Sequence, residues 1–289
     1  REFLMKDSYS FDETKEGAIL SYNKMFYAYL KTFERLGLKA IPLAADTGPI
    51  GGDLSHEFII LAETGESQIY TSKKILDLKI GNFGNDDKSL KGMVKSYTEI
   101  YSATDEKFDQ SDFDKLVKKE DQLVTRGIEV GHIFYFGDKY SKPMKATVNS
   151  SSGANITVEM GSYGIGVSRL VGAIVEANYN DNIMKWPTSV TPFHVAIINL
   201  GKKSDNDTKE KSQKIYEKLQ EKSFDVLLDN TDESPASKFK NFDLIGVPYQ
   251  IIIGSKQGTD EYEFKEVGFD KQIVSLEFII KKLEEVYFN

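Results

Sequence analysis

The chain has 289 residues, a net charge of −8 and no cysteine. These totals exclude disulfides, thiolate metal sites and a cysteine nucleophile, and they argue against nonspecific binding to polyanions. With 40% hydrophobic residues and no apolar run near the ~20 residues of a membrane span, we expect a two-domain, cytoplasmic protein. The first residues resemble neither a signal peptide nor a transit peptide and lack an initiator methionine, so we expect an N-terminally truncated chain.

Periodicity predicts a mixed α and β first domain. A helix over 13–36 is expected to begin at the cap residue Asp12 and to end at Gly37, with an aromatic face buried in the core. Residues 72–125 are rich in lysine and aspartate and predict a small peripheral insertion with two weak helices, near 88–103 and 111–119. The strands expected in this half are 1–11, 39–45, 56–62, 128–136, 143–149 and 155–160, and a helix is expected over 165–178.

The remaining residues alternate strand and helix, which predicts a compact α/β domain. Ser234 and Pro235 have the pattern of an N-cap and first helical residue, Gly246 would end that helix, and Asp207 with Glu210 has the pattern of a capping box. The strands expected are 193–200, 224–228, 248–253 and 261–267, and the helices are 208–222, 235–245 and 273–287. The predicted domains are 1–186 and 193–289, joined by a proline-bounded linker over 187–192.

The segment 160–170 (MGSYGIGVSRL) is the most informative part of the chain. A β-branched run leads into Gly161, Gly164 and Gly166, and an apolar helix with Arg169 near its start is expected to follow. Glycines allow a ligand close to the backbone, and a helix N-terminus attracts anions. Such a glycine cluster, taken alone, is more often a packing turn than a phosphate site.

Arginine usage favours a function for Arg169. Only four of the 37 basic residues are arginines, namely Arg1, Arg35, Arg126 and Arg169. Lysine serves as well on a solvated surface, but only arginine presents the planar fork that holds phosphate in a bidentate way. Arg35 has the pattern of a helix-end charge, and no role is assigned to Arg126. The alternative for Arg169 is an ion pair on the helix surface.

Four segments together resemble the bacterial prolyl-tRNA synthetases, a family of class II aminoacyl-tRNA synthetases. Residues 1–11 (REFLMKDSYSF) resemble the second strand of motif 2, and residues 160–170 resemble motif 3. Between them lie 55–58 (SHEF) and 131–141, which contains GHIF and GDKYS. The resemblance implies an α+β class II core, an antiparallel sheet with flanking helices, followed by an α/β anticodon-binding domain. Residues 229–235 and 244–248 resemble that second domain.

The resemblance implies a two-step reaction in which proline is activated by ATP to prolyl-adenylate and then transferred to tRNA(Pro). ATP and Mg²⁺ are the implied cofactors, no resident metal is expected, and catalysis would consist of positioning and charge stabilisation. A homodimer is expected for the full-length protein. Residues 72–125 are too few for the large editing domain of many relatives, so we expect no hydrolysis of mischarged tRNA in the same chain.

Arg169 is the implied catalytic residue, in contact with the polyphosphate of ATP. Phe3 would stack on adenine, although a core position on the strand is an equally good interpretation. Glu57 is expected to meet Mg²⁺ or the nucleotide, with an ordinary strand-edge glutamate as the alternative. The implied ATP-binding residues are Arg1, Glu2, Phe3, Glu57, Gly164, Gly166 and Arg169.

The proline pocket is implied to lie on the same strands. Alternation places Met5, Asp7 and Tyr9 on one face, and the Asp7 carboxylate is expected to receive the cationic imino group. Core packing is the alternative for Met5 and Tyr9, and a buried structural histidine is the alternative for His132. The implied proline-binding residues are Met5, Asp7, Tyr9, His132, Gly161 and Ser162. Ser162 stands where many relatives have a cysteine that is not a nucleophile.

The second domain is implied to bind the anticodon through Lys238, Phe239 and Lys240. Lysines would attract phosphate and Phe239 would stack on a base. The alternative is that these lysines are merely solvated, and the chain departs from the family in having Ser234 and Ala236 where arginine and glycine are common.

Two other functions remain open on the sequence alone. The first is a catalytically silent, synthetase-like module that binds tRNA or an adenylate. The second is a synthetase for another amino acid such as threonine or histidine. The threonine enzyme would need metal ligands from cysteine and histidine, and the absence of cysteine argues against it.

Overall fold

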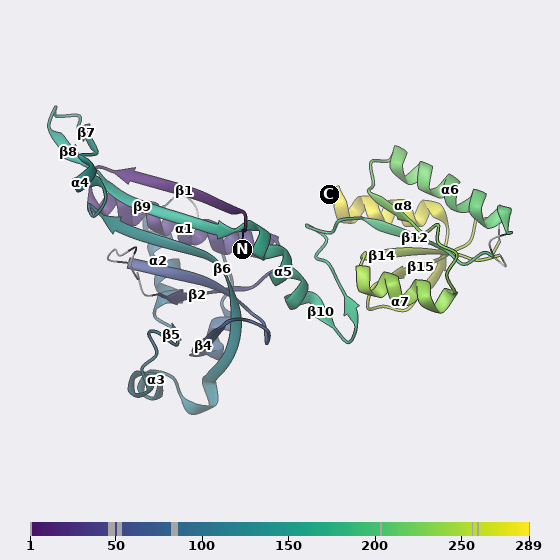
Figure 1. Cartoon of the computed structure of the whole chain (residues 1–289), viewed down its shortest axis with the longest axis horizontal. Helices are drawn as coiled ribbons and strands as arrows, with labels where there is room; N and C mark the ends of the chain where they lie inside the picture. The colour runs from purple at the N-terminus through teal and green to yellow at the C-terminus, as the bar shows by residue number, and fades with distance from the viewer. Residues whose placement is uncertain are drawn as a thin grey trace. The chain divides into compact units, whose positions relative to one another are not determined.

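The computed structural model describes residues 2–45, 50, 54–81, 86–202, 204–255, 257–258 and 260–288. The chain divides into two compact units, Arg1–Ala177 and Asn178–Asn289 (Figure 1). The predicted first domain extends to residue 186, whereas the contacts group residues 178–186 with the second unit. The reason is local, because Met184 packs beside Gly246 and the indole of Trp186 donates a hydrogen bond to the Ile245 carbonyl.

Unit 1 is built on one seven-stranded sheet. Its strands are β1 (Met5–Asp12), β2 (Ala40–Ala44), β3 (Leu54–Leu61), β4 (Ser67–Ser72), β5 (Ser102–Thr104), β6 (Gln122–Gly137) and β9 (Glu159–Gly166). A separate hairpin pairs β7 (Thr147–Asn149) with β8 (Asn155–Thr157). The helices are α1 (Lys15–Arg35), α2 (Asp87–Thr98), α3 (Gln110–Leu116), α4 (Ser141–Met144) and α5 (Val167–Asn178).

The long strand β6 organises this sheet. The strand order is β1-β9-β6-β3-β2-β5-β4, and β6 pairs with β4 as well as with β3 and β9. The first part of β6 pairs with β4 up to Gly127, and the part after it pairs with β3 and β9. The strands β6, β3, β2, β5 and β4 therefore close a ring of pairings, while β9 and β1 extend the sheet on the other side of β6.

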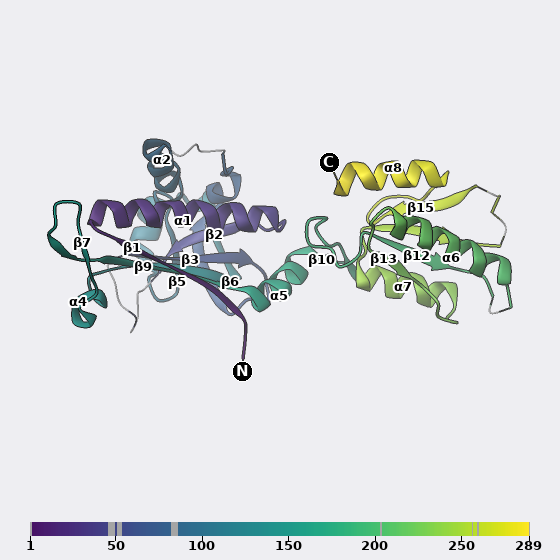
Figure 2. The same cartoon turned by 90° about the horizontal axis from the view of Figure 1, so that it is seen from above.

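Helix α1 covers one face of the sheet and supplies most of the core (Figure 2). Phe26, Tyr29 and Phe33 lie on its buried stripe, and their ring centroids are 5.4, 5.3 and 5.9 Å from that of Phe58 on β3. All four side chains are at most 2% exposed. Aromatic pairs at these separations stabilise a core beyond the area they bury. The amphipathic helix predicted over 13–36 is thus present, with its aromatic face inward.

Several boundaries differ from those expected. The N-cap of α1 is Thr14, whose hydroxyl accepts from the Gly17 amide, because Asp12 is the last residue of β1. The segment 72–125 is not peripheral throughout, since β5 and the start of β6 are part of the main sheet and α2 contacts α1. The strand expected over 143–149 is a short helix α4 followed by β7.

The glycines of the 160–170 segment lie inside a strand. Gly161, Gly164 and Gly166 belong to β9, which pairs with both β1 and β6, and α5 begins only at Val167. The strand therefore runs past its expected end at residue 160, and the alternative of a packing turn at the glycines is wrong. In its place, the glycines leave parts of a sheet surface without side chains.

Unit 2 is a three-layer α/β domain. Its five-stranded sheet has the order β13-β12-β14-β15-β16, with β12 parallel to both neighbours. The strands are β12 (Val195–Asn199), β13 (Val226–Leu228), β14 (Tyr249–Ile253), β15 (Tyr262–Glu266) and β16 (Gln272–Val274), with a small hairpin of β10 (Tyr179–Asn180) and β11 (Ile183–Met184). The helices are α6 (Asn206–Glu221), α7 (Pro235–Ile245) and α8 (Leu276–Tyr287).

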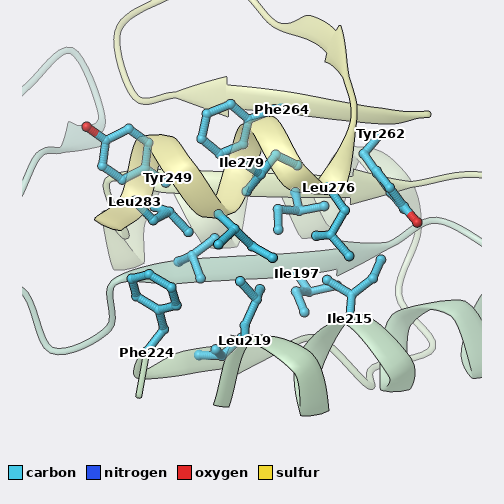
Figure 3. Packing of buried hydrophobic residues seen from close by; sticks show 14 of the residues in the cluster. Ile197, Ile215, Leu219, Phe224, Tyr249, Tyr262, Phe264, Leu276, Ile279 and Leu283 are labelled. Atoms are coloured by element: carbon cyan, nitrogen blue, oxygen red, sulfur yellow. The ribbon is translucent and has the colours of Figure 1, made fainter. Parts of the chain in front are cut away.

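Two apolar clusters fill the space on the two sides of this sheet. In Figure 3 the larger one lies between the strands and helices α6 and α8, with Ile197 of β12, Leu219 of α6 and Ile279 of α8 almost fully buried. The smaller one packs β12 and β14 against Phe242 of α7. The α/β pattern expected for this part of the chain is present.

Of the helix caps predicted in unit 2, those of α7 are confirmed and that of α6 is not. Ser234 caps α7, Pro235 is its first residue and Gly246 ends it with φ +77°, as predicted. Helix α6 is instead capped by Asp205, whose carboxylate accepts from the Thr208 amide, so the expected capping box at Asp207 is wrong. None of the helices in the described ranges has the length and apolar composition needed to span a bilayer.

Candidate active site

Four of the residues singled out in the sequence lie in one row across the sheet of unit 1. Asp7 of β1 pairs with Gly164 of β9, Gly164 pairs with His132 of β6, and His132 pairs with Glu57 of β3. Side chains of directly paired residues in neighbouring strands project from the same face. The row thus brings together two carboxylates and an imidazole from segments up to 125 positions apart in the chain. It lies on the face opposite Phe58 and α1.

Gly164 leaves the middle of this row open. A Cβ at this position would come within 3.1 Å of both the Asp7 carboxylate and the Met5 methyl group, so these side chains lie over the glycine. Gly161, in contrast, is on the α1 face, because its Cβ would meet the Tyr163 hydroxyl at 2.2 Å and that of Ser10 at 2.8 Å. The expectation that Gly161 lines the same pocket as Ser162 is therefore wrong, since the two are adjacent on a strand and face opposite ways.

A third carboxylate reaches the row because the β3–β6 pairing is irregular. The register shifts between Phe58 and Ile59, so that Gly131 and Glu129 pair with consecutive residues of β3. Nδ1 of His132 lies 3.6 Å from Oε1 of Glu129 and 3.8 Å from Oε1 of Glu57. A bulge of this kind changes the direction in which a side chain points.

The three side chains Glu57, Glu129 and His132 form a group that could meet a cation. One donor atom from each lies within 4.8 Å of the others, and all three residues are half-buried. Two carboxylates suit Mg²⁺, which prefers oxygen ligands and is commonly bound through one or two carboxylates plus substrate phosphates. The residues present therefore fit a magnesium ion brought with a nucleotide.

The surroundings shift the pKa values of Glu57 and Glu129 in opposite directions. Burial, followed by the charge of Glu129, raises the pKa of Glu57. Burial would also raise the pKa of Glu129, but its interactions with His132 and Arg169 outweigh this and lower it. Glu129 therefore holds its negative charge more firmly than Glu57.

Arg169 is in the first turn of α5 at the edge of this group. Its guanidinium donates to the Glu129 carbonyl at 2.9 Å and lies 3.4 Å from the Glu129 carboxylate and 3.6 Å from that of Glu66. Its side chain is still 39% exposed. An arginine with weak, half-solvated partners can exchange them for a stronger anion, as a phosphate would require.

Phe3 is held near this arginine. The Leu4 amide donates to the Ser168 hydroxyl at 3.0 Å, which ties the start of the chain to the start of α5. The centre of the Arg169 guanidinium lies 5.8 Å from the centroid of the Phe3 ring, within the range of a cation–π contact. Phe3 is 59% exposed, so the alternative that it is a core residue is wrong.

The other predicted residues of unit 1 are placed as follows. Met5 and Tyr9 are exposed on the open face of β1, so neither packs in the core. Ser162 is half-buried and pairs with Tyr9, while Gly166 pairs with Met5. Glu2 is exposed, and Arg1 lies outside the described residues.

In unit 2 the structure corrects one predicted RNA contact. Lys238 is only 4% exposed, and its ammonium lies 2.8 Å from the Asp229 carboxylate and donates to the carbonyls of Asn199 and Thr231. Two hydrogen bonds and a buried ion pair engage this ammonium, so Lys238 holds the loop after β13 to β12 and is not a surface phosphate contact. Lys240 is exposed and Phe239 packs partly against the smaller core cluster.

Three charged residues matter more than the sequence alone indicated. Glu129 and Glu66 were not singled out, although each contacts Arg169. Arg126 had no assigned role; its guanidinium donates to the carbonyls of Gly65 and Glu66, at 2.6 and 3.2 Å, and so orders the turn that carries Glu66. The scarcity of arginine was the available signal for Arg126.

The matches to known families agree with this arrangement. Residues 1–178 match the family described as tRNA synthetase class II core domain (G, H, P, S and T), and residues 194–286 match the anticodon binding domain. The chain belongs to the class II aminoacyl-tRNA synthetases. Its fold is accordingly a class II core followed by an anticodon-binding domain.

The individual relatives that match the chain are proline–tRNA ligases. The chain is 53% identical to the proline–tRNA ligase of Pelagibacter ubique over 287 residues, which is 99% of this chain and 65% of that protein. It is 55% identical to that of Afipia carboxidovorans over 257 residues, 89% of this chain and 58% of the relative. With the proline–tRNA ligase of Brucella anthropi the identity is 51% over 98% of this chain and 65% of that protein. The chain thus spans about two thirds or less of the length of these relatives.

Proposed function

We propose that the protein containing this chain is a proline–tRNA ligase, which activates proline with ATP and transfers it to tRNA(Pro). The observation that carries the proposal is the row of Asp7, Gly164, His132 and Glu57 with Arg169 beside it. Sequence identity of 50–55% to proline–tRNA ligases over most of the chain supports the choice of amino acid.

Arg169 and Phe3 form the nucleotide side of the proposed site. In the first step the proline carboxylate attacks the α-phosphorus of ATP, the bond to the β-phosphate oxygen breaks, and pyrophosphate leaves. Negative charge builds up on the phosphate oxygens in the transition state, where an arginine stabilises it. Arg169 is the catalytic residue in this scheme, and Phe3 stacks on the adenine ring.

Asp7, His132 and Ser162 form the proline side, together with Met5 and Tyr9 on β1. The Asp7 carboxylate lies over the open surface of Gly164 and binds the cationic imino nitrogen. Glu57 and Glu129 would hold Mg²⁺ when ATP brings it, and the ion would neutralise charge on the phosphates. No side chain acts as a nucleophile in either step, so the chemistry depends on orientation and charge.

Unit 2 provides the proposed contact with tRNA, through exposed Lys240 and the neighbouring Phe239 on α7. The second step, attack of the terminal ribose hydroxyl of tRNA on the prolyl carbonyl, then releases AMP. A homodimer is part of the proposal because the resembled family implies one, and a cytoplasmic location is part of it because the reaction serves translation.

Proline-dependent exchange of pyrophosphate into ATP tests the proposal. The assay uses the extended protein, meaning this chain together with any sequence that precedes it in its gene. Exchange with proline but not with threonine, histidine or serine is expected. Comparable exchange with any of those three would overturn the amino acid assignment. Binding of tRNA without exchange for any amino acid would favour the silent module instead.

A further inference from the structure

The strand that carries Glu57 also presents a buried hydroxyl to His132. Ser55 is two residues earlier on β3 and therefore projects from the same face as Glu57. Its side-chain oxygen is in hydrogen-bond contact with Nε2 of His132, and the residue is only 4% exposed. Its carbonyl accepts from the Ala45 amide at 3.2 Å, which fixes the backbone at this point.

The plane of the His132 ring is fixed independently of Ser55. The ring stacks on Phe134, which follows two positions later on β6, with centroids 3.8 Å apart and an interplanar angle of 22°. With the plane set by Phe134 and one nitrogen held by Ser55, the other nitrogen must face Glu57 and Glu129. The measured separations from Nδ1 to these carboxylates, 3.8 and 3.6 Å, agree with this.

The hydrogen-bonding capacity of each partner decides which nitrogen carries the hydrogen. Ionised carboxylates only accept hydrogen bonds, whereas a serine hydroxyl both donates and accepts. If Nε2 carried the hydrogen of the neutral ring, the lone pair of Nδ1 would point at two carboxylates. With the hydrogen on Nδ1, a positively polarised N–H and not a lone pair faces the two carboxylates, and Nε2 accepts from Ser55.

We propose that Ser55 is a positioning residue that holds His132 in its Nδ1–H tautomer, directed at Glu57 and Glu129. The partner of one imidazole nitrogen sets the state of the other. The meaning of this for catalysis rests on the proposed function, because His132 belongs to the proline side of the site. Without the hydroxyl, Nε2 loses its donor, and the ring can change tautomer or turn over.

Nitrogen NMR of the histidine rings tests the tautomer without any assay of activity. The extended protein is labelled with ¹⁵N-histidine and studied at about pH 8, well above the ordinary histidine pKa of about 6.5. The signals of His132 are assigned by their loss in His132→Asn. We expect unprotonated Nε2 and protonated Nδ1 in the unsubstituted protein, and a shift towards protonated Nε2 in Ser55→Ala. Protonated Nε2 in the unsubstituted protein would overturn the proposal.

Kinetics test whether the tautomer matters for the reaction. In Ser55→Ala the KM for proline is expected to rise about tenfold, a change of about 1.4 kcal/mol, while kcat and the KM for ATP change less than about twofold. Ser55→Thr, which keeps the hydroxyl, should retain the tautomer and most of the proline affinity. Ser212→Ala is the matched control, since it removes an equally buried hydroxyl in unit 2.

The possible outcomes separate the two proposals. A KM for proline in Ser55→Ala equal to that of Ser212→Ala would show that Ser55 does not position the site. If the unsubstituted protein shows no proline-dependent exchange but has the expected tautomer and its change in Ser55→Ala, the proposed function fails and the role of Ser55 in holding His132 stands.

Discussion

Arg169 in unit 1 and Lys238 in unit 2 are both cationic side chains in segments expected to bind phosphate, yet the fold treats them differently. Arg169 is 39% exposed, with two carboxylates at 3.4 and 3.6 Å. Lys238 is 4% exposed and has three close partners, including Asp229 at 2.8 Å. A charge with loose, solvated partners is free to bind a ligand, whereas a charge in a buried ion pair cannot be removed without leaving its counter-charge buried and unpaired.

The same contrast separates two histidines on neighbouring strands. His132 lies half-buried among carboxylates on the open face, while His56 is buried on the α1 face against Tyr22 and Phe26. Burial, followed by unfavourable charge interactions with His132 and Lys107, lowers the pKa of His56 to about 4. This division between exposed groups with loose partners and buried groups with close partners can be tested by four substitutions, described from the largest expected free-energy change to the smallest.

Replacing Lys238 should have the largest effect on stability. In Lys238→Met the Asp229 carboxylate stays buried without its counter-charge, which typically costs about 3–5 kcal/mol. Trp186 is the only tryptophan in the chain and belongs to unit 2, so its fluorescence during urea unfolding reports on this unit. Exposed Lys240→Met on the same helix is the control and should change stability by less than about 0.5 kcal/mol. Equal changes in stability for the two substitutions would show that Lys238 behaves as an exposed lysine and not as part of a buried ion pair.

Replacing Arg169 should affect the reaction and not the fold. In the extended protein, Arg169→Ala is expected to reduce proline-dependent exchange about 10²- to 10³-fold, the scale of losing one charge-stabilising donor. Arg169→Lys should restore it only in part, because the planar fork is lost. Exposed Arg35→Ala, at the end of α1, is the control and should leave exchange unchanged. Full rescue by lysine would contradict the bidentate role.

The buried histidine should make unit 1 sensitive to acid. Unfolded histidine binds a proton below about pH 6.5, whereas folded His56 does so only below about 4. The unfolded state therefore takes up more protons in this window, and the free energy of unfolding should fall by up to about 3 kcal/mol as the pH decreases through it. Hydrogen exchange of the α1 and β3 amides, corrected for intrinsic rates, measures this. The slope should flatten in His56→Asn; an unchanged slope would assign the acid sensitivity to other groups.

Removing the hydroxyl of Tyr22 should have the smallest effect. This hydroxyl is 2.6 Å from Nδ1 of His56, so Tyr22→Phe leaves a buried nitrogen without its partner. The expected cost is about 1–2 kcal/mol, measured by the same exchange experiment. Tyr9→Phe removes an exposed hydroxyl from the open face and should cost less than about 0.5 kcal/mol. A larger cost for Tyr9 would show that the open face also holds the fold together.

Much of the architecture follows from local patterns in the sequence. The stripe of Tyr22, Tyr29 and Phe33 predicts a helix buried on one side, and it is α1. The segment after residue 193 predicts an α/β domain, and Ser234 and Gly246 mark both ends of α7. These features depend on periodicities and turn preferences that act over a few residues, so they can be read without knowing the fold.

The composition of the candidate site was only partly predictable. Alternation correctly places Met5, Asp7 and Tyr9 on one face, but it cannot give the strand order that sets Asp7 in line with His132 and Glu57. That row depends on long-range pairing among β1, β9, β6 and β3. The resemblance to a known family supplied the candidates, and the register showed which of them share a face.

Local sequence patterns are therefore enough to give the type of element at most positions and the candidate side chains. Which charges are buried with partners and which stay exposed depends on the tertiary structure. Lys238 is buried because β12 and the loop after β13 surround it, and Glu129 reaches His132 because the pairing of β3 and β6 shifts at Phe58. Burial and register depend on contacts between distant segments, and no local pattern contains that information.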